Sequence, residues 1–403
     1  MIVVSGGDLV LPGRIVTEGA LVIDGGRIAA IESHRVDPAG AAIIDAADCY
    51  VVPGFIDVHV HGLHGHDTLD EGDAVARIAA HLPRYGVTAF CPTTVACSPA
   101  ALQRVLQQVR QARTTPAAGS ARVLPAHLES NFINPEYRGA QPAGCLRAPA
   151  SAHTDGEFSG RDVLDVIAAS RPDVGIVTLA PELPGGIDLV RALVTAGHRV
   201  SLGHSGADLD TAFAAIDAGA RHATHLFNRM TPMTHRAPGL PGAVLAREEV
   251  AVELICDAYH VHPAMCRVAM AAKSPGGVMA ITDATAGAGL EVGSEARLGG
   301  QVIRVRDGAA FLSEGTLAGS TLTMDRAFRN IVVRFGGSPV DAAVMCSTTP
   351  ARELGLSGFG VLADGAIADV VVLDRGFHAV RTFIAGEEVW SAPVPNSAPG
   401  RDV

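Results

Sequence analysis

Histidines and carboxylates that could bind a metal ion follow short apolar stretches at several places in the chain. The first such motif is His59-x-His61, at the end of an apolar run. Because side chains alternate across a strand, both imidazoles project to the same face, where they could hold one cation. The motif alone also fits an ordinary strand end. Further ligands elsewhere in the chain decide between the two interpretations.

Four later residues of ligand type also end or follow apolar stretches. They are Glu129, which lies two residues after His127, then His204, His225 and Asp283. Each has a structural alternative of its own: a buried, paired carboxylate for Glu129, a structural histidine for His204 or His225, and a helix N-cap for Asp283. As a set with the His-x-His motif they favour a metal centre. There Asp283 could take a proton from a water whose pKa a cation has lowered.

Eight candidate strands position these residues. The strands end near His61, Cys91, Glu129, Pro181, His204, His225, Asp257 and Asp283. Ala-rich helical stretches at 102–112, 160–169, 189–196 and 209–218 separate several of them. This alternation predicts a TIM-like (β/α)8 barrel over residues 51–352, with its chemistry at the C-terminal strand ends. Residues 1–50 and 353–403 contain short β-type runs between Gly turns, and we expect them to form one discontinuous β-sandwich domain.

Composition limits the classes of partner. The net charge of −11 argues against a nucleic-acid binder, because phosphate backbones need a basic face. We find no signal peptide and no apolar segment long enough to cross a bilayer, so no membrane partner is expected. The seven cysteines lack CxxC spacing, which predicts reduced thiols and a cytoplasmic protein. The only lysine, Lys273, precedes a Gly-Gly pair in an expected loop, which disfavours mechanisms that need a catalytic lysine.

The order His-x-His, Glu, His, His, Asp on successive strands resembles the amidohydrolase superfamily, and the surrounding motifs are similar to those of N-acetylglucosamine-6-phosphate deacetylases. The similar motifs are 53–62, 127–129, 132–135, 203–205, 224–228, 236–239, 257–260, 282–285 and 317–320. This resemblance implies one divalent cation held by His59, His61, Glu129 and Asp283, and a second held by Glu129, His204 and His225. It also implies that Asp283 is the general base and acid. Zinc is the expected ion, with iron, manganese, cobalt and nickel as alternatives.

The same resemblance implies a small substrate, an N-acetyl amino-sugar phosphate that is cleaved to acetate and a free amine. His260 would hold the sugar and Asn228 the 6-phosphate, with Arg236 reaching across a homodimer interface. Gln141 occupies a substrate-binding position where many members of the family have histidine. Two further departures from the family are Ser130-Asn131, in place of Gly-Pro, and Arg229, in place of a small residue.

These departures leave a second enzyme hypothesis open, in which the same metal centre acts on another N-acyl amine or on an unphosphorylated amino sugar. Cyclic amide hydrolysis of the dihydropyrimidinase kind is disfavoured, because no lysine follows the fourth strand. A non-catalytic barrel would be expected to have lost a metal ligand or Asp283, and none of them is missing.

Overall fold

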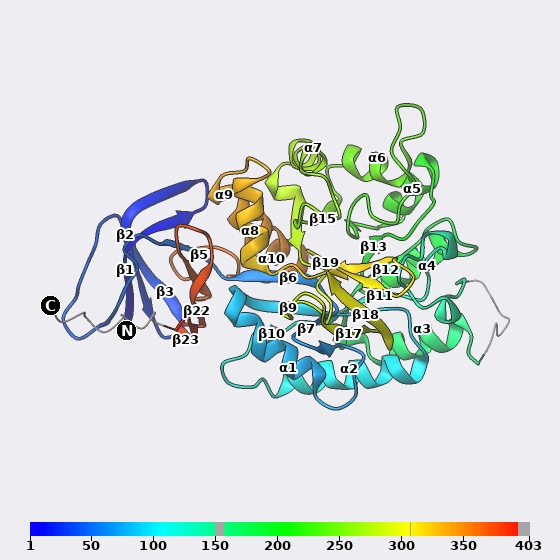
Figure 1. Ribbon diagram of the computed structural model, residues 1–403. Coiled ribbons are helices and arrows are strands. Elements are labelled where there is room, and N and C mark those ends of the chain that lie inside the picture. The colour runs from blue at the N-terminus through cyan, green and yellow to red at the C-terminus, as the bar shows by residue number, and fades with distance from the viewer. Residues whose placement is uncertain (150–156, 307, 394–403) are drawn as a thin grey trace.

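Eight parallel strands form a barrel in the computed structural model, which describes residues 1–149, 157–306 and 308–393 (Figure 1). The strands are β6 (Phe55–Val60), β9 (Val87–Thr94), β11 (Ala126–Glu129), β12 (Val174–Leu179), β13 (Arg199–Leu202), β14 (His222–Ala223), β15 (Ala251–Ile255) and β16 (Val278–Ile281). Each pairs with the next in this order. The Asp283 amide donates to the His59 carbonyl at 3.0 Å and so joins the last strand to the first. The predicted TIM-like barrel is confirmed.

The barrel strands are mostly apolar because both of their faces are buried, which is typical of parallel sheets. Helices follow most of the strands, and several of them begin at side-chain caps: Ser98 accepts from the third residue of its helix, and Ser159 and Asp162 form a capping box. The helices are α1 (Ala74–His81), α2 (Pro99–Thr114), α3 (Gly160–Ala169), α4 (Gly186–Thr195), α5 (Leu209–Asp217), α6 (Gly239–Ala246), α7 (Pro263–Lys273), α8 (Met324–Val333), α9 (Pro339–Ala343) and α10 (Thr349–Leu354). All four expected helices are present.

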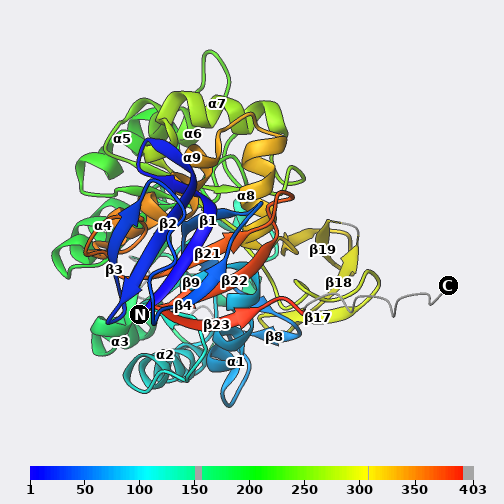
Figure 2. The ribbon, with the colours of Figure 1, turned by 90° about the vertical axis from the view of Figure 1, so that its left-hand side faces the viewer.

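The two chain ends meet in one β-rich domain beside the barrel (Figures 1 and 2). Its strands are β1 (Ile2–Leu11), β2 (Arg14–Asp24), β3 (Arg27–Glu32), β4 (Ala42–Asp45), β5 (Tyr50–Pro53), β21 (Val370–Leu373), β22 (Ala379–Ile384) and β23 (Glu387–Ser391). They hydrogen-bond as a single sheet, in which β5 pairs with β21 and connects the two ends. Because β5 ends at Pro53, this sheet extends slightly past the expected barrel start at residue 51. Residues 394–403 of the expected domain lie outside the described residues.

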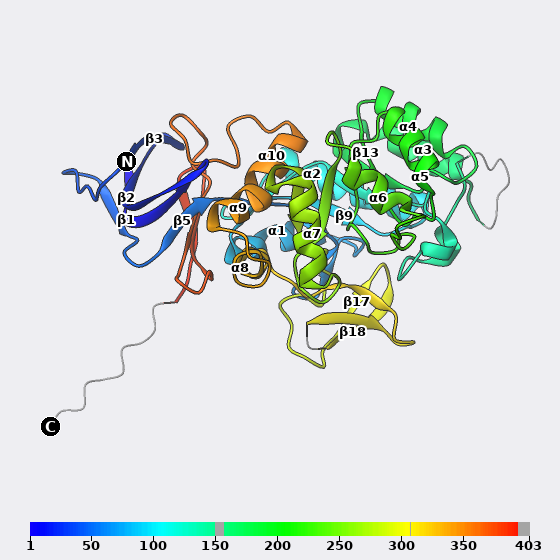
Figure 3. The same cartoon turned by 90° about the horizontal axis from the view of Figure 1, so that it is seen from above.

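A four-stranded antiparallel sheet that the sequence analysis did not predict follows the last barrel strand (Figure 3). It consists of β17 (Glu295–Leu298), β18 (Gln301–Arg306), β19 (Ala309–Leu312) and β20 (Leu317–Ser320). The Ser320 amide donates to the Asp283 carbonyl at 2.8 Å, so the sheet is attached to the strand end that carries Asp283. Shorter strands are β7 (Gly62–Leu63), β8 (His66–Asp67) and β10 (Arg122–Val123). Within the described residues, no helix is long and apolar enough to cross a membrane.

Candidate active site

The first group of possible metal ligands lies where β6 meets the end of β16. The Nε2 atoms of His59 and His61 are 3.1 Å apart, which confirms that both imidazoles face the same side of the strand. The Asp283 carboxylate approaches them, with its Oδ1 at 3.2 Å from His61 Nε2 and 3.5 Å from His59 Nε2. All three side chains are buried. We call His59, His61 and Asp283 the first group.

The second group lies on the neighbouring strand ends. Glu129 Oε1 is 2.9 Å from His204 Nε2 and 2.8 Å from His225 Nε2, and these two nitrogens are 3.0 Å apart. The other carboxylate oxygen, Oε2, is 3.5 Å from His61 Nε2 in the first group. We call Glu129, His204 and His225 the second group. Glu129 lies between the two groups, where a bridging ligand would be.

Three of these side chains reach the centre through unusual backbone conformations. His204, His225 and Asp283 have positive φ angles of 49°, 31° and 51°. Residues other than glycine rarely adopt such angles, and each costs on the order of 1–3 kcal/mol. Each of the three lies two residues after the end of its strand, so the turn redirects the side chain towards the barrel mouth. Strain of this kind is concentrated at functional sites.

The donor atoms fit divalent cations. His59 Nδ1 is 2.9 Å from Glu253 Oε2, and His204 Nδ1 is 2.7 Å from the Tyr137 carbonyl oxygen. Because a carboxylate or carbonyl oxygen only accepts, each Nδ1 is the donor, and the Nε2 of the neutral imidazole is left as a ligand atom. Four imidazoles and two carboxylates thus direct their ligand atoms to one place. Two sets that share Glu129 could each hold one cation: His59, His61 and Glu129, and Glu129, His204 and His225.

Electrostatics make the same place attractive to positive charge. Burial raises the pKa of Glu129, but His204 and His225 outweigh burial and hold it well below its usual value. Burial likewise raises the pKa of Asp283, and His59 and His61 lower it further than burial raises it. Burial lowers the pKa of His59, yet Asp283 and Glu253 bring it up to about 10, so a cation that binds Nε2 would displace a proton from this ring. Both carboxylates are therefore ionised and available to a cation.

Four polar or charged residues other than the ligands line the cavity above them. They are Gln141, Asn228, Arg229 and His260. The amide of Gln141 donates to Glu129 Oε2, and its oxygen accepts from the Ala96 amide at 2.7 Å. His260 Nδ1 is 2.6 Å from the Asp257 carboxylate, which leaves Nε2 as the free ring nitrogen. Leu298, Leu317 and Gly319 of the unpredicted sheet also line the cavity, together with Val95, Gly139 and Ala140.

The remaining sequence-predicted residues lie elsewhere. Arg236 is exposed and is not part of the cavity lining in this single chain. Ser130 and Asn131 are buried and bond to backbone: the Ser130 hydroxyl donates to the Thr178 carbonyl, and the Asn131 amide donates to the carbonyls of Cys97 and Cys145. Neither residue lines the cavity, so of the noted departures from the family only Gln141 and Arg229 face it.

Two groups that the sequence analysis missed support the ligands. Glu253 lies within β15 and touches His59, and the Tyr137 carbonyl holds His204. A charged residue inside the apolar stretch Ala251–Ile255 was the available signal for Glu253, because a buried charge must be paired. No sequence signal identifies a backbone carbonyl. Lys273 ends α7 instead of lying in a loop, and its Nζ donates to the Arg247 carbonyl at 2.6 Å, away from the mouth.

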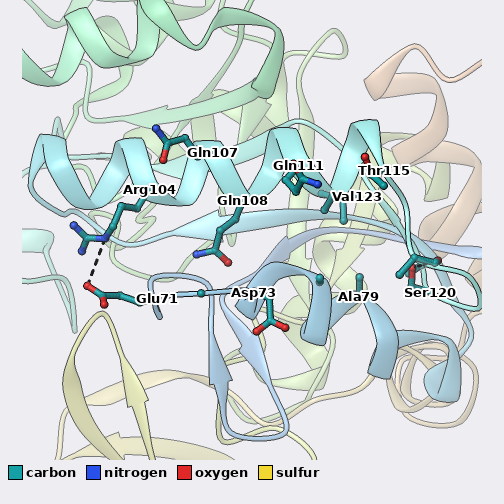
Figure 4. A pocket seen from close by; sticks show the side chains of 15 residues that line it. Glu71, Asp73, Ala79, Arg104, Gln107, Gln108, Gln111, Thr115, Ser120 and Val123 are labelled. Atoms are coloured by element: carbon teal, nitrogen blue, oxygen red, sulfur yellow. Dashed lines mark hydrogen bonds and ion pairs between the residues drawn. The ribbon is translucent and has the colours of Figure 1, made fainter.

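A second pocket lies on the outside of the barrel, between α1 and α2 (Figure 4). Arg104 and Glu71 face each other across one end of it, with Nε and Oε1 3.8 Å apart. The Gln108 side chain donates to the Asp70 carbonyl and accepts from the Val75 amide, so it joins α2 to the start of α1. No residue that was predicted to act chemically lines this pocket.

The barrel and its mouth define a hydrolytic enzyme of the amidohydrolase type. The chain belongs to the amidohydrolase family, whose model matches residues 50–389. It is 37% identical to N-acetylgalactosamine-6-phosphate deacetylase of Escherichia coli O157:H7 over 370 residues, covering 91% of this chain and 93% of that protein. It is 38% identical to human N-acetylglucosamine-6-phosphate deacetylase over 396 residues, covering 94% and 93%.

Solved structures of deacetylases are also similar to this chain. An N-acetyl-D-glucosamine-6-phosphate deacetylase mutant from Mycobacterium smegmatis, in complex with N-acetyl-D-glucosamine-6-phosphate, has a TM-score of 0.85 and 33% identity, covering 96% of this chain and 99% of that one. The Thermotoga maritima N-acetylglucosamine-6-phosphate deacetylase has a TM-score of 0.84 and 31% identity, covering 97% and 100%. Family membership implies a divalent metal, and the two buried ligand groups are where it would bind.

Proposed function

We propose that this protein hydrolyses the acetamide of N-acetylglucosamine 6-phosphate, giving glucosamine 6-phosphate and acetate. One observation carries the proposal: four imidazoles and two carboxylates from five strand ends converge at the barrel mouth, with Glu129 between the two groups. The named relatives and the ligand in the Mycobacterium smegmatis complex support this substrate.

In the proposed reaction the ligand groups hold one or two divalent cations, with zinc expected. A bound cation would polarise the amide carbonyl and lower the pKa of water. Asp283 Oδ1 takes the proton of the attacking water and passes it to the leaving nitrogen, so that one water adds across the C–N bond. Asp283 suits this task because it is ionised and lies beside both histidines of the first group.

The substrate is proposed to lie over Gln141, Asn228 and His260, with the 6-phosphate towards Arg229. Arg229 is an exposed cation that lines the cavity, and a guanidinium suits a phosphate monoester. Arg236 is exposed and does not line the cavity of its own chain, so its proposed contact with the phosphate requires a homodimer. Analytical ultracentrifugation would show the mass of such a dimer. The seven free thiols support the proposed cytoplasmic location.

A second candidate is N-acetylgalactosamine 6-phosphate. It rests on the relative from Escherichia coli O157:H7, which is about as similar as the human enzyme. The two sugars differ only in the orientation of one hydroxyl group, and the ligand groups would serve either of them. The cavity residues Gln141 and Arg229, which depart from the resembled family, are the positions that could separate the two substrates.

Acetate release by the zinc-loaded protein tests the proposal. The substrates are N-acetylglucosamine 6-phosphate, its C4 epimer and N-acetylglucosamine without phosphate. Fast release from the first alone is expected. Faster release from the epimer would establish the second candidate. Equal release from the unphosphorylated sugar would show that the enzyme does not recognise the phosphate. No release from any of them, with metal bound, would reject the substrate class and direct the search to other N-acyl amines.

A further inference from the structure

Glu253 is a carboxylate buried in the barrel interior beneath the first group. It is the central residue of β15, has 0% exposure and does not line the cavity. A substrate in the cavity therefore cannot reach it. A charge buried in this way is destabilising by several kcal/mol unless partners offset the cost. The hydrogen-bond partners of Glu253 therefore indicate what role this buried carboxylate has.

One of its carboxylate oxygens contacts both ligand groups. Glu253 Oε2 accepts from His59 Nδ1 at 2.9 Å and also from the backbone amide of His225 at 3.4 Å. The other oxygen, Oε1, is buried and has no hydrogen-bond partner among the residues that the structure describes. The strong contact is therefore the one to His59, through the ring nitrogen that faces away from the barrel mouth.

His127 lies beside this pair, and the three residues could be taken for a third metal site. The hydrogen bonds of His127 argue against that. Its Nδ1 lies 2.9 Å from the Val58 carbonyl, which can only accept, so this nitrogen is the donor and Nε2 accepts from the Thr178 hydroxyl at 2.7 Å. Both of its nitrogens are occupied, and none is free for a cation.

We propose that Glu253 is a positioning residue that holds His59 with its proton on Nδ1 and its Nε2 directed to the barrel mouth, and that cation binding by the first group depends on it. The proposal rests on the proposed role of His59 as a metal ligand. A carboxylate behind a ligating histidine fixes the ring tautomer and makes the ligand more basic, and its loss typically weakens metal binding about 10–100-fold. Among the residues that the structure describes, the second group has no such carboxylate: the Tyr137 carbonyl holds His204, and His225 Nδ1 has no hydrogen-bond partner.

Zinc affinity of Glu253→Leu and Glu253→Gln tests this proposal. The metal-free full chain is titrated with zinc against a chromophoric chelator, and the His59→Ala and His204→Ala variants assign the binding steps to the two groups. We expect Glu253→Leu to weaken the first-group step about 10–100-fold. The second-group step should change much less, because Glu253 contacts that group only through the longer hydrogen bond from the His225 amide. Glu253→Gln should lose less, since its amide oxygen still accepts from Nδ1 but carries no charge.

Asp173→Asn is the matched control. Asp173 is also a buried carboxylate, but it pairs with Arg110 and Arg113 before the start of β12, away from the ligands. It should lower the unfolding temperature without changing either zinc step. If either folded Glu253 variant binds zinc at the first group with wild-type affinity, the proposal is overturned. If His59→Ala nevertheless weakens that zinc step, His59 remains assigned as a metal ligand. No loss in His59→Ala would instead overturn the assignment of His59 as a ligand, and with it both proposals.

Discussion

The two ligand groups at the barrel mouth are built in different ways. The first has its two histidines one residue apart at the end of β6, and a buried carboxylate stands behind one of them. The second takes one histidine from each of two strand ends, both with positive φ, and a backbone carbonyl stands behind one of them. A side chain therefore holds a histidine of the first group, whereas a backbone carbonyl holds a histidine of the second.

This difference has a consequence for how each group can be lost. A single substitution at Glu253 removes the support of the first group, whereas the carbonyl behind His204 persists through any substitution at Tyr137. The first group also contains the proposed base, Asp283, whose carboxylate lies 3.2 Å from His61. We therefore expect the first group to be the more easily altered by mutation and the second to be the more constant.

The largest effect is expected for Asp283→Asn, which separates proton transfer from cation binding. The asparagine amide has nearly the same shape but cannot take a proton, so kcat should fall by about 10²–10⁴-fold. The second-group zinc step should remain, because Asp283 contacts only the first group's histidines. Steady-state kinetics and zinc titration of the folded variant measure both quantities. A near-normal kcat would place the base outside the first group.

Much of the barrel and of its two ligand groups could be predicted from the sequence. His-x-His shows its geometry directly, because alternation along a strand puts both rings on one side, and apolar runs locate every barrel strand. The positive φ of His204 and His225 has no residue-type signal, since glycine would be the usual choice. Glu253 was overlooked because the environment of a strand interior depends on partners far away in the chain. The β17–β20 sheet escaped notice because its strands are short and half exposed.

A smaller effect is expected for Glu129→Ala, which tests whether the groups are coupled. Glu129 contacts both, through Oε1 to the second group and through Oε2 to His61. Truncating one partner of a buried charge pair costs about 3 kcal/mol or more, so both zinc steps should weaken roughly a hundredfold. His61→Ala and His204→Ala should each weaken only one step. If Glu129→Ala weakens only one of the two zinc-binding steps, the two groups are independent sites.

The smallest effect is expected for Gln141→Leu, and it distinguishes the two oxygens of Glu129. The Gln141 amide donates to Glu129 Oε2, the oxygen that lies beside His61 of the first group. It makes no hydrogen bond to Glu129 Oε1. A hydrogen bond to a charged group contributes about 1.5–3 kcal/mol, and its loss at the lower end of this range should weaken the first-group zinc step about tenfold. The second-group step should not change, because His204 and His225 hold Oε1 directly. Zinc titration beside KM for N-acetylglucosamine 6-phosphate separates the alternatives: a raised KM with both zinc steps intact would assign Gln141 to the substrate alone, as the sequence predicted.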